Sequence, residues 1–114
     1  MRYILASALF LASPAMAQDL ATADQIKAAL AGNTVMGSMA ASGAYAEFYA
    51  ADGTIRAADY SASWAIADNA MCFTYGEGAA ICWNVRLLGD SVTWVSNGNV
   101  EGTGTILQGN PNNW

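Results

Sequence analysis

Turn signals recur at short intervals along most of this chain. They occur at Ser42-Gly43, Asp52-Gly53, Asp68-Asn69, Gly76-Glu77-Gly78, Gly89-Asp90 and Asn97-Gly98. These closely spaced turns leave room only for short secondary-structure elements. They predict strands near 34–40, 44–50, 54–60, 62–67, 70–75, 79–88, 91–96 and 99–107. The only prolines are Pro14 and Pro111. No proline therefore interrupts a hydrogen-bonded ladder between residues 34 and 107.

One helix is predicted ahead of the strands, over residues 22–31. Thr22 and Gln25 have the spacing of a capping box, and Asp24 lies in the first turn. Ile26 and Leu30 form one apolar edge, and Gly32 ends the helix.

Three tight connections, at 68–69, 76–78 and 89–90, determine the strand register. They pair Trp64 with Phe73, Met71 with Trp83, and Val85 with Trp94. One face then carries Trp64, Ile66, Met71, Phe73, Ile81, Trp83, Val85, Leu87, Val92 and Trp94. The opposite face carries Ser63, Ala65, Cys72, Thr74, Cys82, Asn84, Arg86 and Thr93.

A twisted meander of about eight strands tends to curl and close. We therefore predict an all-β fold, an antiparallel up-and-down meander that forms a small barrel, with the helix covering one end or side. The alternative is a curved open sheet or sandwich. Gly102-Thr103-Gly104 indicates a bend or close packing beneath Trp94.

The two cysteines are predicted to form a disulfide across the hairpin at 76–78. With Gly78 in the left-handed position, Tyr75 lies opposite Ala79 and Cys72 lies opposite Cys82. Cross-strand partners lie about 4.5–5.5 Å apart at Cα, a distance that a disulfide accepts. A redox-active pair is the other interpretation, but the separation of ten residues and the absence of histidine argue against it.

Residues 1–17 have the pattern of a cleavable signal peptide. Arg2 is followed by an apolar run from Tyr3 to Ala12, and Ala15-Met16-Ala17 gives the small-x-small cleavage pattern. We therefore expect an exported protein, periplasmic or extracellular, with one domain over residues 18–114. No later apolar run approaches ~20 residues, so no membrane span is expected.

The composition excludes several functions. Removal of the signal takes away Arg2, one of four basic residues, and leaves all nine acids, so the mature net charge is −6. Three dispersed cations cannot neutralise a phosphate backbone, so no nucleic acid is expected. The chain has no histidine, and oxidised cysteines offer neither a nucleophile nor a metal thiolate. The acids, including Glu47 and Glu101, are scattered and are interpreted as turn-forming or solvated residues. We expect no enzyme, no metal site and no cofactor.

Aromatic side chains are the remaining candidates for a site. Trp64, Phe73, Trp83 and Trp94 share the apolar face, where they either fill the core or line a cavity for one small ligand. Tyr45, Tyr49, Tyr60 and Trp114 are candidates for an exposed patch that binds a sugar or a protein.

Several segments also resemble a family of small secreted bacterial β-proteins of uncharacterised function. They are Leu30–Thr34, Tyr49–Gly53, the Trp64 strand, Met71–Phe73, Cys82-Trp83 and Gly109–Pro111. In form alone, the cysteine-clipped hairpin is similar to that of periplasmic lysozyme inhibitors, but the sequence contains no inhibitory loop motif. The resemblance implies a fold and no catalytic residues. We therefore expect an exported non-enzymatic binding module of the cell envelope whose partner is a small apolar ligand. A protein-directed inhibitor, or an accessory or structural envelope protein, is the alternative.

Overall fold

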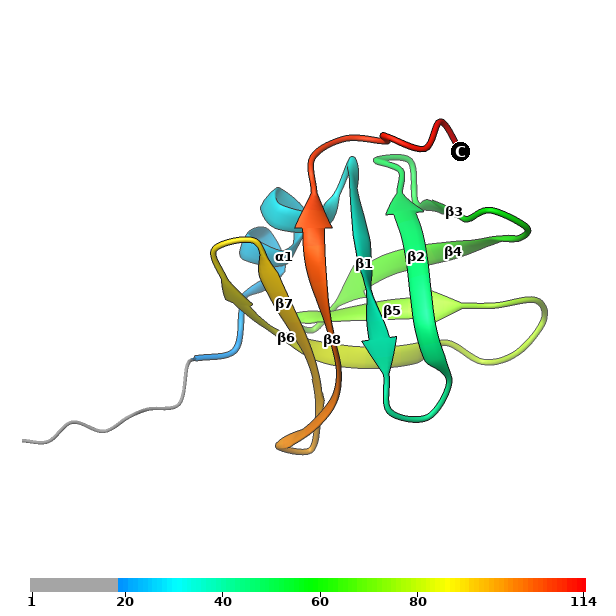
Figure 1. The fold of residues 1–114 in the computed structure, drawn as a ribbon. Helices are drawn as coiled ribbons and strands as arrows, with labels where there is room; N and C mark the ends of the chain where they lie inside the picture. The colour runs from blue at the N-terminus through cyan, green and yellow to red at the C-terminus, as the bar shows by residue number, and fades with distance from the viewer. Residues whose placement is uncertain (1–18) are drawn as a thin grey trace, which may run out of the picture.

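The computed structural model describes residues 19–114, so the predicted signal peptide at 1–17 lies outside the described residues. One helix, α1 (Ala23–Leu30), is followed by eight strands (Figure 1). The strands are β1 (Asn33–Met39), β2 (Gly43–Tyr49), β3 (Thr54–Arg56), β4 (Ser61–Ala67), β5 (Ala70–Thr74), β6 (Ile81–Leu88), β7 (Ser91–Ser96) and β8 (Asn99–Leu107).

The strands form a closed antiparallel barrel. Each pairs with its neighbour in the sequence, and β8 returns to pair with β1. The predicted up-and-down barrel is confirmed, and the alternative of an open sheet is wrong. In Figure 1, β8 lies beside β1 near the front of the barrel.

The predicted register is also confirmed. Trp64 pairs with Phe73, Met71 with Trp83, and Val85 with Trp94. At the β4–β5 turn, Asp68 and Asn69 have φ angles of 51° and 58°. Two consecutive left-handed residues are what a two-residue hairpin turn requires, and Asp and Asn tolerate that conformation better than most residues do.

The β5–β6 connection is longer than predicted. The ladder stops at Phe73–Ile81, so Tyr75 and Ala79 form no pair. The left-handed glycine is Gly76, with φ 62°, and not Gly78. Gly76 therefore turns the chain immediately after Tyr75, and this earlier turn opens the loop without changing the register of the cysteines.

Cys72 and Cys82 form the predicted disulfide, on the outer face of the barrel. The two residues are directly opposite each other, with their Cα atoms 3.9 Å apart. This separation is shorter than the expected range of about 4.5–5.5 Å.

Helix α1 closes one end of the barrel. Thr22 and Gln25 form the predicted capping box, and the Asn69 side chain accepts a 2.7 Å hydrogen bond from the backbone N–H of Ala23. Ile26 and Leu30 are fully buried, and they pack in one cluster with Val35, Ile55, Met71, Val85, Val92 and other buried residues of the barrel. This half of the interior is a filled core.

Among residues 19–114, no helix covers the other end of the barrel. The β1–β2, β3–β4, β5–β6 and β7–β8 connections lie there, away from α1 (Figure 1). Ile81 illustrates the difference between the ends: it lies on the predicted inward face but is 51% exposed, because it is the first residue of β6 at this rim.

Candidate functional site

A cavity of about 750 Å³ enters the barrel from the end opposite α1. Its wall is mainly aromatic, and Glu47 and Glu101 are the charged residues that line it. The aromatic residues lining it are Tyr45, Tyr49, Tyr60, Phe73, Tyr75, Trp83 and Trp94. A small eight-stranded barrel of this kind is either filled or holds one small ligand, and here half of it is filled and half is open.

Glu47 is the most unusual residue of the cavity because its side chain is an acid that is only 3% exposed. Three tyrosine hydroxyls donate hydrogen bonds to its carboxylate. Tyr49 donates to Oε1 at 2.9 Å, and Tyr60 and Tyr75 donate to Oε2 at 2.5 and 2.9 Å. Three donated hydrogen bonds compensate an ionised carboxylate for much of the hydration that burial removes.

Three segments of the chain bring this cluster together. In β2, residues 45, 47 and 49 alternate onto the inner face of the barrel. Tyr60 precedes β4 and Tyr75 follows β5, and both reach Glu47 from loops at the rim. The two rim tyrosines remain partly accessible, at 42% and 44% exposure, so the cluster spans the distance from the interior to the solvent.

A second polar contact of the cavity wall lies beside β8. The indole N–H of Trp94 donates to the Tyr45 hydroxyl at 2.8 Å, and that hydroxyl lies 3.1 Å from the backbone carbonyl of Thr103, to which it donates. Trp94 pairs with Gly102. A Cβ at Gly104 would collide with the Tyr45 hydroxyl and with the Val35 side chain. The close packing predicted beneath Trp94 is therefore confirmed: Gly104 leaves the space that Tyr45 occupies.

The aromatic rings pack on one another around Phe73. The rings of Tyr49 and Trp94 meet Phe73 edge to face, with centroids 5.8 and 5.4 Å away. Tyr75 stacks on Phe73 at 6.3 Å, and Tyr60 meets Tyr75 edge to face at 6.2 Å. These contacts hold the cavity wall in a defined shape, since such pairs prefer specific geometries.

Burial raises the pKa of all four tyrosines that line the cavity. The pKa of Tyr45 rises to about 12, mainly through desolvation, with a contribution from the negative charge of Glu47. Desolvation and the same carboxylate hold the pKa values of Tyr49, Tyr60 and Tyr75 well above the ordinary value of 10.0. All four hydroxyls therefore keep their protons at neutral pH and remain able to donate.

No basic residue lines this cavity among the described residues. Lys27 lies on α1 at the other end of the barrel. The Arg56 guanidinium donates to the Trp114 carbonyl at 3.5 Å, and Arg86 is on the outer face of β6. The electrostatic character of the cavity is therefore set by two acids.

The structure places the four predicted aromatic residues in two groups. Phe73, Trp83 and Trp94 line the cavity. Trp64 does not: it packs against the core cluster, and its indole N–H donates to the Ala50 carbonyl at 2.9 Å.

Two interpretations from the sequence are wrong. Tyr45, Tyr49 and Tyr60 do not form an outer patch with Trp114, because they turn into the cavity. Glu47 is not a solvated acid. The signal that could have revealed the placement of Tyr45, Glu47 and Tyr49 is their alternation, which puts the acid on the same strand face as two large aromatic residues.

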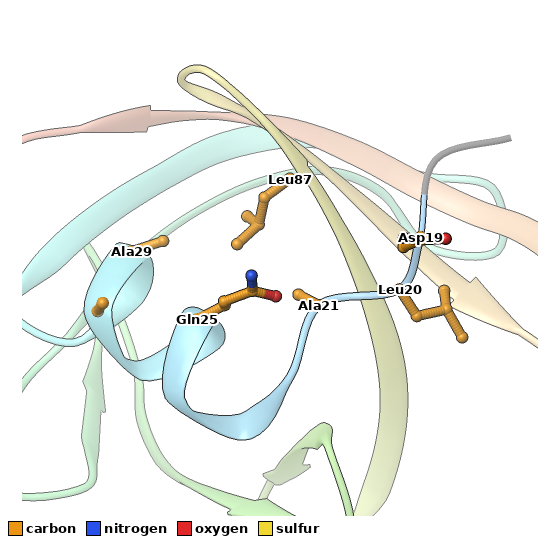
Figure 2. Close-up of a pocket in the computed structure, with 7 residues that line it drawn as sticks. Asp19, Leu20, Ala21, Gln25, Ala29 and Leu87 are labelled. Carbon is orange, nitrogen blue, oxygen red and sulfur yellow. The ribbon is translucent and has the colours of Figure 1, made fainter. Parts of the chain in front are cut away.

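A second hollow, of about 730 Å³, lies between α1, β6 and the start of the described chain. Figure 2 shows Leu87 pointing toward α1, with Gln25 and Ala29 facing the same space. Its lining consists mainly of small or aliphatic side chains, with Asp19 as its one charged residue. It offers no buried polar group to orient a ligand, so the aromatic cavity is the better candidate.

Within the described part of the chain, His, Cys, Asp and Glu residues form no group of three that could hold a metal ion. Across residues 19–114, no helix has the length and apolar character needed to cross a membrane. The Asn97-Gly98 segment forms the predicted turn between β7 and β8, with both residues at positive φ.

No protein-family model matches this sequence, and no curated protein or solved structure is significantly similar to it. The resemblance to small secreted bacterial proteins therefore stays a prediction.

Proposed function

We propose that this protein is an exported, non-enzymatic binding module of the cell envelope that holds one small ligand with an apolar body. The cavity of about 750 Å³ carries the proposal. Its volume falls within the range of about 300–1,000 Å³ typical of small-molecule sites, and a few polar groups converge inside an apolar wall, as such sites require. The disulfide is consistent with an oxidising compartment and hence with export.

The division of the barrel supports a binding role over a purely structural one. At the α1 end the side chains fill the interior, with Ile26, Leu30 and Val35 fully buried. At the other end, large aromatic side chains surround a space that they do not fill. A barrel that needed only stability would gain by filling this half as well, because empty apolar space reduces stability.

A titration with N-phenyl-1-naphthylamine, a neutral apolar fluorophore, tests this proposal. We expect saturable binding with one site per chain, quenching of tryptophan fluorescence, because Trp83 and Trp94 line the cavity, and a higher melting temperature. Met39→Trp should abolish binding, because Met39 lines the cavity and the larger ring would occupy it.

Met36→Trp is the matched control. It makes the same change on the same strand, but Met36 is 46% exposed and does not line the cavity. This variant should bind like the wild type. Non-saturable binding, or equal loss of binding in both variants, would contradict the proposal.

A protein-directed inhibitor or accessory protein is a second candidate, favoured by the rim. Tyr60, Tyr75 and Ile81 are large apolar residues with 42–51% exposure at the mouth of the cavity. Native mass spectrometry of protein recovered from the envelope of its host distinguishes the two functions. A retained small mass supports the ligand module, whereas a retained protein chain supports the second candidate.

A further inference from the structure

We infer that the ligand carries a protonated amine at one end of an apolar body, and that Glu47 is the residue that recognises the amine. This inference rests on the proposed binding function and specifies its ligand class. Three independent features of the cavity support this inference: the hydrogen bonds already made around Glu47, the negative charge of its lining residues and its aromatic wall.

The hydrogen bonds around Glu47 leave acceptors and few donors for a ligand. An ionised carboxylate offers about four lone-pair positions, and three are taken by the hydroxyls of Tyr49, Tyr60 and Tyr75. Those three hydroxyl protons are thereby committed to Glu47. The tyrosine oxygens can offer only lone pairs toward the cavity, so a ligand that reaches this cluster must supply N–H or O–H donors.

The charge of the cavity selects a cation among such donors. Glu47 and Glu101 both line it, and none of Lys27, Arg56 and Arg86 does. Glu47 is nearly inaccessible, so its attraction for a cation is screened less than that of a surface acid. A carboxylate ligand would meet two like charges and no counter-ion from the described residues.

The wall of the cavity suits the same ligand. The faces of aromatic rings attract cations, and Trp does so most strongly. Six of the seven aromatic residues on the wall are Tyr or Trp: Tyr45, Tyr49, Tyr60, Tyr75, Trp83 and Trp94. A neutral alcohol would satisfy the hydrogen bond alone, whereas an ammonium group would also gain from the carboxylate and the rings.

Isothermal titration of the processed protein with hexylamine, hexan-1-ol and hexanoate tests the inference. The three compounds share an apolar chain and differ in the charge of the end group. At neutral pH and low salt, hexylamine should bind at least about tenfold more tightly than hexan-1-ol, and hexanoate should bind more weakly than either. Added salt should weaken hexylamine binding and leave hexan-1-ol binding unchanged.

Glu47→Gln is the variant that isolates the charge. Glutamine keeps the size and one acceptor oxygen, so the affinity for hexylamine should fall to that for hexan-1-ol, while hexan-1-ol binding persists. Glu77→Gln makes the same change in the exposed β5–β6 loop, outside the cavity, and should leave the full preference intact. Circular dichroism checks that each variant is folded. If Glu47→Gln does not fold, the relative affinities of the wild-type protein for the three compounds test the inference.

The outcomes separate this inference from the proposed function. If the neutral fluorophore binds but hexylamine has no advantage over hexan-1-ol, or hexanoate binds best, the inference is overturned and the binding function stands. If neither the fluorophore nor any of the three compounds binds, both are overturned.

Discussion

The indole N–H of Trp94 donates a hydrogen bond of 2.8 Å to the hydroxyl of Tyr45, so two residues 49 positions apart in the sequence share a polar contact inside the barrel. Trp94 is only 2% exposed, and its N–H has little access to water. Tyr45 thus provides the acceptor that allows a tryptophan to serve as part of the wall.

Replacing Tyr45 by Phe should lower the free energy of unfolding by about 1–3 kcal/mol, because the buried Trp94 donor loses its acceptor. Chemical denaturation measures this. A double-mutant cycle with Trp94→Phe should show coupling of about 1 kcal/mol between the two sites. Strictly additive effects would mean that the hydrogen bond does not form.

Replacing Gly104 by Ala should destabilise the protein by about 1–3 kcal/mol, as overpacking of a core does. The added methyl group would collide with the Tyr45 hydroxyl and the Val35 side chain. Gly78→Ala is the control, because the new Cβ there would meet only the Tyr75 carbonyl, at an ordinary contact distance of 3.6 Å. Similar melting temperatures for the two variants would disprove the close packing around Gly104.

The tyrosine cluster should make the protein sensitive to alkali. In the unfolded chain these tyrosines ionise near pH 10, whereas folding raises the pKa of Tyr45 to about 12 and holds the pKa values of Tyr49, Tyr60 and Tyr75 well above 10. Above pH 10 the unfolded state therefore binds fewer protons than the folded state, and stability falls as pH rises. Below pH 10 the tyrosines contribute no slope.

Absorbance of tyrosinate during an alkaline titration measures this effect. Little signal should develop near pH 10 in the folded, processed protein, and the signal should appear together with loss of the near-ultraviolet circular dichroism. The same protein in denaturant should titrate near pH 10. A folded protein with a transition of several tyrosines at pH 10 would show that the hydroxyls are not buried against Glu47.

Removing the disulfide should lower stability modestly and leave ligand binding in place. Cys72 and Cys82 are ten residues apart, and loop-closure entropy sets an upper limit of about 2.5–3 kcal/mol. The double Cys→Ser variant should still bind the fluorophore, because the bridge is on the outer face and neither cysteine lines the cavity. Loss of binding with the fold retained would indicate that the bridge shapes the cavity.

Processing at Gln18 is the expectation that concerns export. Intact mass of protein recovered from the exported fraction should correspond to residues 18–114, with or without cyclisation of the terminal glutamine. Full-length protein retained in the cytoplasm would contradict the predicted localisation.

The local rules of strands were enough to predict the barrel wall from the sequence. Side chains alternate with a period of two, and the tight turns at 68–69 and 89–90 leave little freedom of register, so the pairing of Trp64 with Phe73 and of Val85 with Trp94 follows from counting. The β5–β6 loop was predicted less well, since Gly76 and Gly78 are both able to adopt positive φ and the spacing does not distinguish them.

The cavity was not predictable in the same way. Whether the interior of a barrel is filled depends on the summed volumes of the inward side chains from all eight strands. A missing side chain, as at Gly104, therefore affects the remaining space as much as a tryptophan does. Glu47 was misread because an acid in an otherwise alternating strand is usually solvated. Tyr60 and Tyr75 contact Glu47 from loops, where no sequence periodicity indicates which way a side chain points.

The pairing of β1 with β8 also determines when this protein can finish folding. Thr34 lies opposite Leu107, and Gly37 lies opposite Gly104, so the first strand has one unsatisfied edge until the last strand arrives. The hairpins between them can form early because they join neighbours, but ring closure waits for a contact between distant parts of the chain, which is intrinsically slow. A chain threaded through a translocation pore from its N-terminus would therefore complete its cavity only after β8 has emerged.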